Sequence, residues 1–294
     1  MKGVPLVHGS NSGGRHLVVW RIHLVLVVCF NKLGGIKMEI RNLEEFKEFV
    51  RKINCERDEF IWRDLVKEFE ITIYEPITDL SKLFMSCGFK RIDLWRLDTS
   101  KVENMSNMFY DCQSLIDLNL SYLHTESVTD MSSMFESCSN LEVLEIPHFD
   151  TRNVKNMSKM FDRCKSLEEL DLSSFDTRNV EDMGYMFAWC DCLKKLDLSN
   201  FNTENVREMD GMFCYSKSLK ELDLSNFNTK NLLIYDGMLE GCNVDVIISE
   251  RGIELEKLES DKVRILSKGG KGEITSSDKK SSGVDDVFSS SSLF

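Results

Sequence analysis

The cysteines are the residues whose type and spacing most directly suggest chemistry in this sequence. One cysteine recurs every 25 or 26 residues, and a serine replaces it once near the end of the series. Thiolates bind zinc and form disulfides, so a regular series invites a metal or a redox interpretation. The series consists of Cys87, Cys112, Cys138, Cys164, Cys190, Ser216 and Cys242.

The surroundings of these cysteines nevertheless predict buried free thiols. Each cysteine lies in a segment with helical spacing, and neighbouring helix axes lie ~8–10 Å apart. A disulfide needs Cα atoms within ~7 Å, so bridging successive cysteines would require distortion. Cysteine is also a small, frequently buried residue, and its replacement by Ser216 favours a requirement for size.

Motifs for metal binding and catalysis are weak or missing. The best metal candidate is the pair Cys190 and Cys192 with Cys214 one repeat later, but zinc takes four ligands and no histidine lies nearby. The sequence contains no H-E-x-x-H, no G-x-S-x-G and no phosphate-binding loop. We therefore expect no metal, no cofactor and no catalytic residue, which indicates a non-enzymatic protein.

A repeated unit carries the cysteines. Its pattern is M-x-x-M-F-x-x-C-x-x-L-x-x-L-x-L-x-x-F-x-T-x-x-V, and we number its positions from the first methionine. A unit this short cannot bury its own apolar face, so repeats of this length predict a stack of units. The repeats begin at Leu80, Met105, Met131, Met157, Met183, Met209 and Tyr235.

Two hydrophobic periods alternate within each repeat. Positions 1, 4, 5, 8 and 11 have the spacing of a helix with one apolar stripe, and an Asp or Asn usually precedes position 1 as a candidate N-cap. Leucines at positions 14 and 16 alternate with polar residues, as in a short strand. The pattern predicts an α/β solenoid with a parallel sheet on one face and short helices on the other.

The stretch "LDLSSFDTRNVEDMGYMFAWC" within the repeats resembles the BspA-like leucine-rich repeat surface proteins. That family includes mycoplasma-type repeats of 25–26 residues whose function is unknown. The resemblance implies a leucine-rich repeat solenoid that acts in adhesion and protein binding at the cell surface or after secretion. It implies no shared catalytic site.

The composition changes at both ends of the repeat array. Residues 1–37 contain the broken apolar run Leu17–Phe30, too short for a transmembrane helix. An early start codon before Met38, a degenerate export signal and a structured piece all remain open for this segment. We expect residues 38–79 to form a helical cap, residues 80–248 the array, and residues 249–294 a polar, disordered tail.

Outward-facing positions of the predicted sheet are the candidate binding surface. The protein is acidic, with 37 Lys and Arg against 49 Asp and Glu, which disfavours nucleic acid and anionic membranes and suits basic surfaces or cations. Stacked acids repel, so those at position 15 either bond to nearby backbone groups or attract a basic protein. The first repeats add aromatic and basic residues typical of binding hot spots. The candidate residues are Asp93, Glu145, Asp171, Asp197 and Asp223, together with Trp95, Arg96, Tyr122 and His148.

A second exposed cluster is predicted on the opposite side, from Tyr185, Trp189 and Tyr215. Trp189 and Tyr215 share position 7 of successive repeats and should be neighbours. The cluster is either an oligomer contact or a set of partly buried side chains. For the whole chain, the sequence favours protein–protein recognition in surface adhesion. The alternative is an intracellular scaffold or effector, which the thiol content and the absence of a clean export signal favour, and an enzyme is a distant third.

Overall fold

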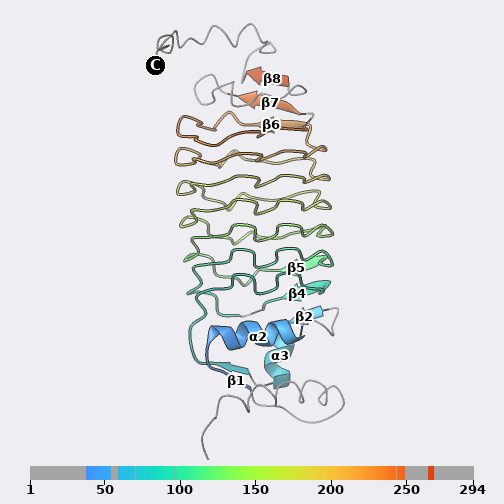
Figure 1. Ribbon diagram of the computed structural model, residues 1–294, viewed down its shortest axis with the longest axis vertical. Helices are drawn as coiled ribbons and strands as arrows, with labels where there is room; N and C mark the ends of the chain where they lie inside the picture. The colour runs from blue at the N-terminus through green and yellow to red at the C-terminus, as the bar shows by residue number, and fades with distance from the viewer. Residues whose placement is uncertain are drawn as a thin grey trace, which may run out of the picture.

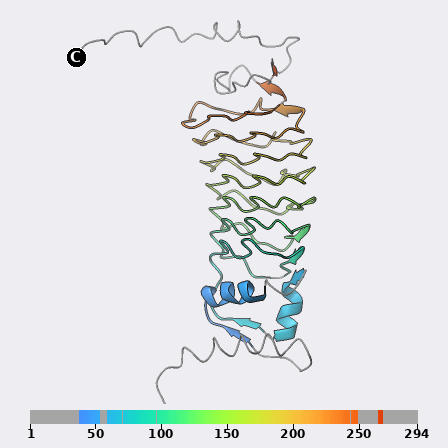
Figure 2. The ribbon, with the colours of Figure 1, turned by 45° about the vertical axis from the view of Figure 1, so that its right-hand side comes forward.

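The repeats lie one above another along the long axis of the computed structural model, and the N-terminal helices cover one end of the stack (Figure 1). The view turned by 45° shows the same stacked turns of chain (Figure 2). The structure describes residues 38–53, 59–69, 71–95, 97–242, 244–248 and 264–267.

The N-terminal cap consists of short strands and two helices. Its elements are β1 (Met38–Ile40), α2 (Leu43–Ile53), β2 (Glu59–Ile61), α3 (Trp62–Phe69) and β3 (Ile71–Ile73). β1 pairs in parallel with β3, and β2 joins the first strand of the array. Both helices lie within residues 38–79, the segment that the sequence predicts as a helical cap, and β3 follows them.

Polar and aromatic contacts join the cap to the first repeat. Lys47 of α2 is buried, and its Nζ lies 3.3 Å from Asp79 Oδ2 and 3.3 Å from Ser81 Oγ. The Phe60 ring of β2 packs edge-on against Phe84 with 5.0 Å between centroids. A buried lysine is costly without a partner, so the Asp79 contact fixes how the cap sits on the stack.

Strands of the array are fewer and shorter than the sequence predicts. The described residues form three small parallel sheets, in the orders β1-β3, β2-β4-β5 and β6-β7-β8. Between β5 and β6, the described residues pair only through isolated parallel bridges. The bridge between Asn119 and Glu145 extends the β4-β5 pairing, and a second series joins the residues before position 1, from Asp79 to Ile234. The continuous parallel sheet that the sequence predicts is therefore wrong for the described residues, in which parallel pairing is limited to short strands and isolated bridges. The remaining strands are β4 (Arg91–Asp93), β5 (Asp117–Asn119), β6 (Glu221–Asp223), β7 (Asp245–Ile248) and β8 (Arg264–Ser267).

Two strands, β7 and β8, lie at the C-terminal end of the described residues. β7 lies at the end of residues 80–248, the segment that the sequence predicts as the repeat array. β8 lies within residues 249–294, the segment expected to be a polar tail, and it pairs in parallel with β7.

The predicted helices of the repeats are also wrong, because positions 1–8 form two successive turns. Positions 3 and 7 have positive φ in every repeat, between 54° and 69°. An α-helix requires φ near −63°, so neither position belongs to one. Asn156, which the helical interpretation made an N-cap, accepts the backbone N–H of Ser158 at 2.9 Å and opens the first turn instead.

The buried residues of these turns have the same spacing in the sequence as those of an amphipathic helix, because each turn returns the chain to the buried side after four residues. Met160 N–H donates to Met157 O within one turn, whereas Phe161 N–H donates to Met186 O in the next repeat at 2.9 Å. Amides at positions 1, 3, 5 and 7 all bond forward to the next repeat in this way, as Met131, Ser133, Phe135 and Ser137 do. These bonds hold neighbouring repeats too close together for helices, which pack ~8–10 Å apart.

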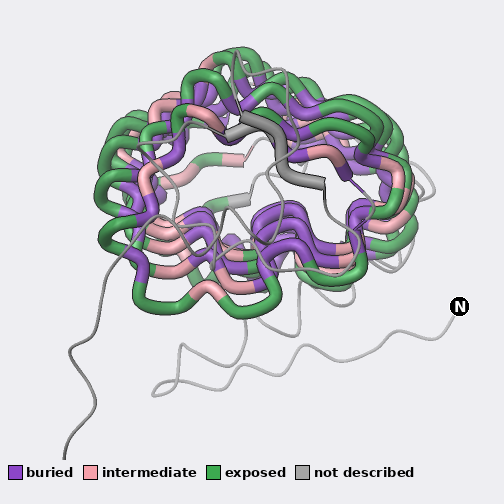
Figure 3. Tube along the Cα trace, turned by 90° about the horizontal axis from the view of Figure 1, so that it is seen from above, coloured by how far each residue is buried: buried purple, intermediate pink, exposed green. Residues whose placement is uncertain are grey.

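A column of stacked phenylalanines runs through the core at position 5. Neighbouring rings have centroids 5.4–5.8 Å apart and planes within 2–9° of parallel. Buried positions line the inside of the coil when it is viewed along its axis (Figure 3). The column consists of Phe84, Phe109, Phe135, Phe161, Phe187 and Phe213.

Buried threonines at position 21 connect one repeat to the next. The Thr177 hydroxyl donates to Asn202 O at 2.9 Å and accepts the Asn202 N–H at 2.8 Å. The same two bonds recur from Thr99, Thr125, Thr151 and Thr203. Each hydroxyl thereby satisfies both backbone groups of one residue in the following repeat.

We expect Thr177→Val to lower the free energy of unfolding by ~2–3 kcal/mol. Valine keeps the shape of threonine but leaves the N–H and C=O of Asn202 without this partner inside the stack. Urea unfolding measures the change, with Thr177→Ser as the control that keeps the hydroxyl. Equal stability of the valine and serine variants would contradict the role given to the hydroxyl.

Candidate functional site

Two of the predicted face residues meet at the N-terminal end of the array. Trp95 and Tyr122 pack edge-on with 6.0 Å between ring centroids, and Tyr122 keeps 46% of its surface exposed. Arg63 of α3 places its Cζ 5.2 Å from the Trp95 ring centroid, within the range of a cation–π contact. Sequence reasoning missed Arg63, because the cap was treated only as a cover for the stack.

A groove of about 680 Å³ lies beside these aromatic residues, where the cap meets the first repeat. Its lining includes Trp62, Ile73, Tyr74 and Trp95, and Tyr74 is 61% exposed. Partly buried aromatic rings next to exposed ones are typical of surfaces that bind other proteins. No pattern in the sequence indicates this groove, because it is built by the packing of the cap against the array.

Of the other two predicted binding residues at this end, His148 is described by the structure and Arg96 is not. His148 is exposed and occupies the position of Tyr122 one repeat later, at the edge of a depression of about 650 Å³ that Arg152 and Arg178 also line. Arg96 lies outside the described residues. The structure therefore places Trp95, Tyr122 and His148 on three successive repeats.

The acids at position 15 face outward and also support their own backbone. Asp171 Oδ1 and Asp197 Oδ1 each accept a backbone N–H two residues later, from Ser173 and Ser199, at 2.9 Å. These hydrogen bonds lower the pKa of both carboxyl groups, so both stay charged at neutral pH. The two interpretations of the column are thus compatible, since each acid forms a local turn and remains an exposed charge.

The rest of the position-15 column follows the same rule with one exception. Asp223 Oδ1 accepts from Ser225 N–H at 2.9 Å, and Asp93 Oδ1 accepts from Trp95 N–H at 2.9 Å. Glu145 is exposed and belongs to the isolated bridge with Asn119. The acidic column therefore extends from the first repeat to the sixth, with Asn119 as its one neutral member.

Position 18 is not simply an outward-facing position in the later repeats. The Asn200 side-chain amide donates to Leu172 O and Phe175 O in the preceding repeat, at 2.9 and 2.7 Å. The Asn226 amide repeats these bonds, and Ser174 Oγ donates to a carbonyl of the repeat before it. The later repeats thus use position 18 for stacking, which leaves the aromatic and histidine side chains of the early repeats as the distinctive part of this face.

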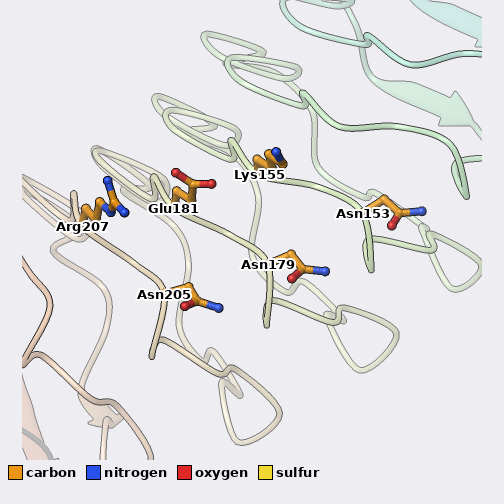
Figure 4. Close-up of a pocket in the computed structure, with 6 residues that line it drawn as sticks. All are labelled: Asn153, Lys155, Asn179, Glu181, Asn205 and Arg207. Atoms are coloured by element: carbon orange, nitrogen blue, oxygen red, sulfur yellow. The ribbon is translucent and has the colours of Figure 1, made fainter.

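A different face of the stack carries a column of asparagines beside a column of charges (Figure 4). These residues line a depression of about 410 Å³. The amide of Asn179 donates to Arg152 O at 2.7 Å, and the other asparagines at position 23 bond in the same way. The charges of the neighbouring column alternate in sign, at Lys155, Glu181 and Arg207. The asparagines of this face hold successive repeats together, which explains their repetition without a binding role.

The cysteines of the repeat series are buried and unpaired. Cys164 Sγ donates to Phe135 O at 3.2 Å, and Ser216 Oγ donates to Phe187 O at 2.6 Å. The slot therefore requires a small side chain that is also a hydrogen-bond donor. The premise that helices separate these cysteines by 8–10 Å is wrong, since the repeats contain turns.

The metal candidate does not come together. Cys190 and Cys214 are buried, whereas Cys192 is exposed. Within the described part of the chain, no three His, Cys, Asp or Glu side chains gather as metal ligands do.

Trp189 and Tyr215 are neighbours, as their shared position predicts. Their rings stack with centroids 4.3 Å apart, and the Tyr215 hydroxyl donates to Glu240 Oε1 at 2.6 Å. Tyr185 is 37% exposed and lies over Gly211, where an added Cβ would sit 2.4 Å from the tyrosine ring. Both Trp189 and Tyr215 are half-buried by such neighbours, and a role of the cluster in oligomer contacts remains a prediction.

One buried acid on the turn side has an unusual environment. Asp162 is 2% exposed, and its Oδ1 has no hydrogen-bond partner among the described residues. Its Oδ2 lies 2.7 Å from Arg163 Nη1, and Glu136 lies near the same guanidinium group at 3.9 Å. Burial raises the pKa of Asp162 to about 6, despite the favourable charge of Arg163.

We expect Asp162→Asn to stabilise the protein at pH 7.5 and to flatten its pH dependence. Because the folded pKa of about 6 exceeds the unfolded value of 3.8, the contribution of Asp162 to stability is complete below pH 3.8 and is lost as the pH rises through 6. The variant should therefore gain ~1–3 kcal/mol in the free energy of unfolding at pH 7.5. Urea unfolding at pH 5.0 and 7.5 measures this, with the exposed Asp236→Asn as control, and no gain at pH 7.5 would contradict it.

Neither described helix has the length and apolar character needed to cross a membrane. A family model described as "Mycoplasma protein of unknown function, DUF285" matches residues 78–195 and, in a second match, residues 140–246. The two matches cover more than half of the chain and coincide with the stacked repeats. The comparison with curated proteins found no match, and neither did the comparison with solved structures. The chain belongs to the DUF285 family of mycoplasma proteins of unknown function.

Proposed function

We propose that this protein is a non-enzymatic, BspA-like leucine-rich repeat solenoid that binds another protein through the face of position 15 and its aromatic end. The contact between Trp95 and Tyr122, with Arg63 against the Trp95 ring, carries the proposal. Tryptophan, tyrosine and arginine dominate the binding energy of many protein interfaces. The adjoining groove offers space in which side chains of a partner can be buried.

Charge indicates the kind of partner. The exposed acids Asp171, Asp197 and Asp223 continue the face away from its aromatic end, and the first two have lowered pKa values. Such a column favours a protein with a complementary basic surface. Charge attraction mainly accelerates association and weakens with salt, whereas the aromatic end supplies contacts that exclude water.

Surface adhesion is the setting that the repeat pattern favours, and an intracellular scaffold or effector is the second candidate. The buried thiols favour the second setting, because reduced cysteines are typical of intracellular proteins. Cell fractionation distinguishes the two settings. An adhesin must appear in the membrane or culture fraction, and an intracellular scaffold must remain in the cytosolic fraction.

We expect the triple variant Trp95→Ala, Tyr122→Ala and His148→Ala to lose at least ~10-fold in affinity for the partner. Removal of two aromatic side chains from a binding hot spot costs more than ~1.4 kcal/mol, the equivalent of a tenfold change. Affinity capture with the wild-type protein identifies the partner, and calorimetry on the purified pair measures the dissociation constants.

The matched control replaces Lys155, Glu181 and Arg207 by alanine on the face of Figure 4. These side chains are also exposed and lie on three successive repeats, but away from the aromatic end. The control should keep wild-type affinity, and both variants should keep the wild-type melting temperature. Unchanged binding by the aromatic triple variant would refute this location for the interface.

A further inference from the structure

Cys87 differs from the other members of the cysteine column because it comes first. In every later repeat, the position-8 side chain donates to the position-5 carbonyl of the repeat before it. Cys112 Sγ donates in this way to Phe84 O at 2.9 Å, and Cys138 Sγ donates to Phe109 O at 3.1 Å. No repeat precedes Cys87, and its sulfur lies 3.2 Å from Cys112 Sγ.

The backbone around this pair is held at the spacing that a disulfide needs. Phe84 N–H donates to Met108 O at 2.9 Å, and Ser86 N–H donates to Tyr110 O at 2.7 Å, so hydrogen bonds join the two repeats on the N-terminal side of Cys87. Chains bonded side by side in this manner lie ~4.7–4.9 Å apart. Disulfides join Cα atoms ~4.4–6.8 Å apart, and the two sulfurs need to approach by only ~1 Å.

We propose that Cys87 and Cys112 form a disulfide that fastens the first repeat to the second when the chain folds in the presence of a low-molecular-weight disulfide such as oxidised glutathione. A thiolate of the pair attacks one glutathione sulfur and releases one glutathione thiolate. The second protein thiolate then attacks the protein sulfur of this mixed disulfide and releases the other glutathione. Two protein thiols are oxidised, and one glutathione disulfide is reduced to two thiols.

The surroundings of the pair determine when the bond forms. Cys112 is fully buried and Cys87 nearly so, and their mutual contact together with burial raises the pKa of Cys87 well above its usual range. The thiolate is the reactive form, so the folded, capped protein reacts slowly. The bond therefore forms before the cap closes over the first repeat, and in the folded protein it is shielded from reductants.

The bond has a structural consequence for the aromatic end of the binding face. Trp95 and Tyr122 belong to the first and second repeats, which this bond ties together. Closing a loop of this length stabilises a protein chiefly by restricting its unfolded chain. We expect the oxidised protein to melt ~5–10 °C above its reduced form.

The experiment uses the full chain with Cys29, Cys55 and Cys192 replaced by serine, which removes the cysteines that lie outside the buried positions of the described repeats. The protein is refolded with a mixture of reduced and oxidised glutathione, free thiols are blocked, and disulfides are mapped by peptide mass spectrometry. The expected product has one bond, between Cys87 and Cys112, and forms at least ~10-fold faster during refolding than in the already folded protein.

Two further variants on that background make the test specific. Cys87→Ser should abolish the bond and the increase in melting temperature, whereas Cys164→Ser, within the same column, should leave both unchanged. Serine occupies this slot naturally at Ser216, so both variants should fold. A bond between Cys112 and Cys138, scrambled pairing, or no bond under these conditions would each overturn the proposal.

Discussion

Hydrogen bonding between identical positions of successive repeats is the constraint on which the rest of this structure depends. The forward bonds of positions 1, 3, 5 and 7, together with the threonine column, place every residue above its equivalent about one backbone spacing away. The stacked phenylalanines at 5.4–5.8 Å follow from that spacing. Helices pack too far apart to fit this spacing between repeats. Each repeat therefore forms turns, in which positions 3 and 7 have positive φ.

The same constraint limits which positions can differ between repeats. Buried positions must match their neighbours above and below, so methionine, phenylalanine, cysteine and leucine recur and leave little freedom for variation. Even some outward positions are used for stacking, as Asn200 and Asn226 are. Variation concentrates where the stack begins, next to the cap, and there Trp95 and Tyr122 stand beside Arg63.

Much of this arrangement could be predicted from the sequence, and the failures have physical causes. Repetition predicts which residues of the array are buried, and the predicted helical cap contains α2 and α3. Helices were predicted at positions 1–8 because two four-residue turns bury the same positions as a helix. Side chains such as Lys159 and Tyr185 give no hint of positive φ. The glycines Gly211, Gly237 and Gly241 carry that signal, and Asn107 and Asp111 carry it more weakly. The groove beside Trp95 was missed because it depends on docking between cap and array.

Nuclear Overhauser contacts across the segment Met131–Cys138 test the stacked-turn architecture most directly. We predict contacts between residues one repeat apart, such as the rings of Phe135 and Phe161 with centroids 5.6 Å apart, and positive φ at Ser133 and Ser137. The carbon chemical shifts of these two serines should lie outside the range typical of an α-helix. An unbroken series of contacts from each α-proton to the amide three residues later, with helical shifts from Met131 to Cys138, would contradict this architecture.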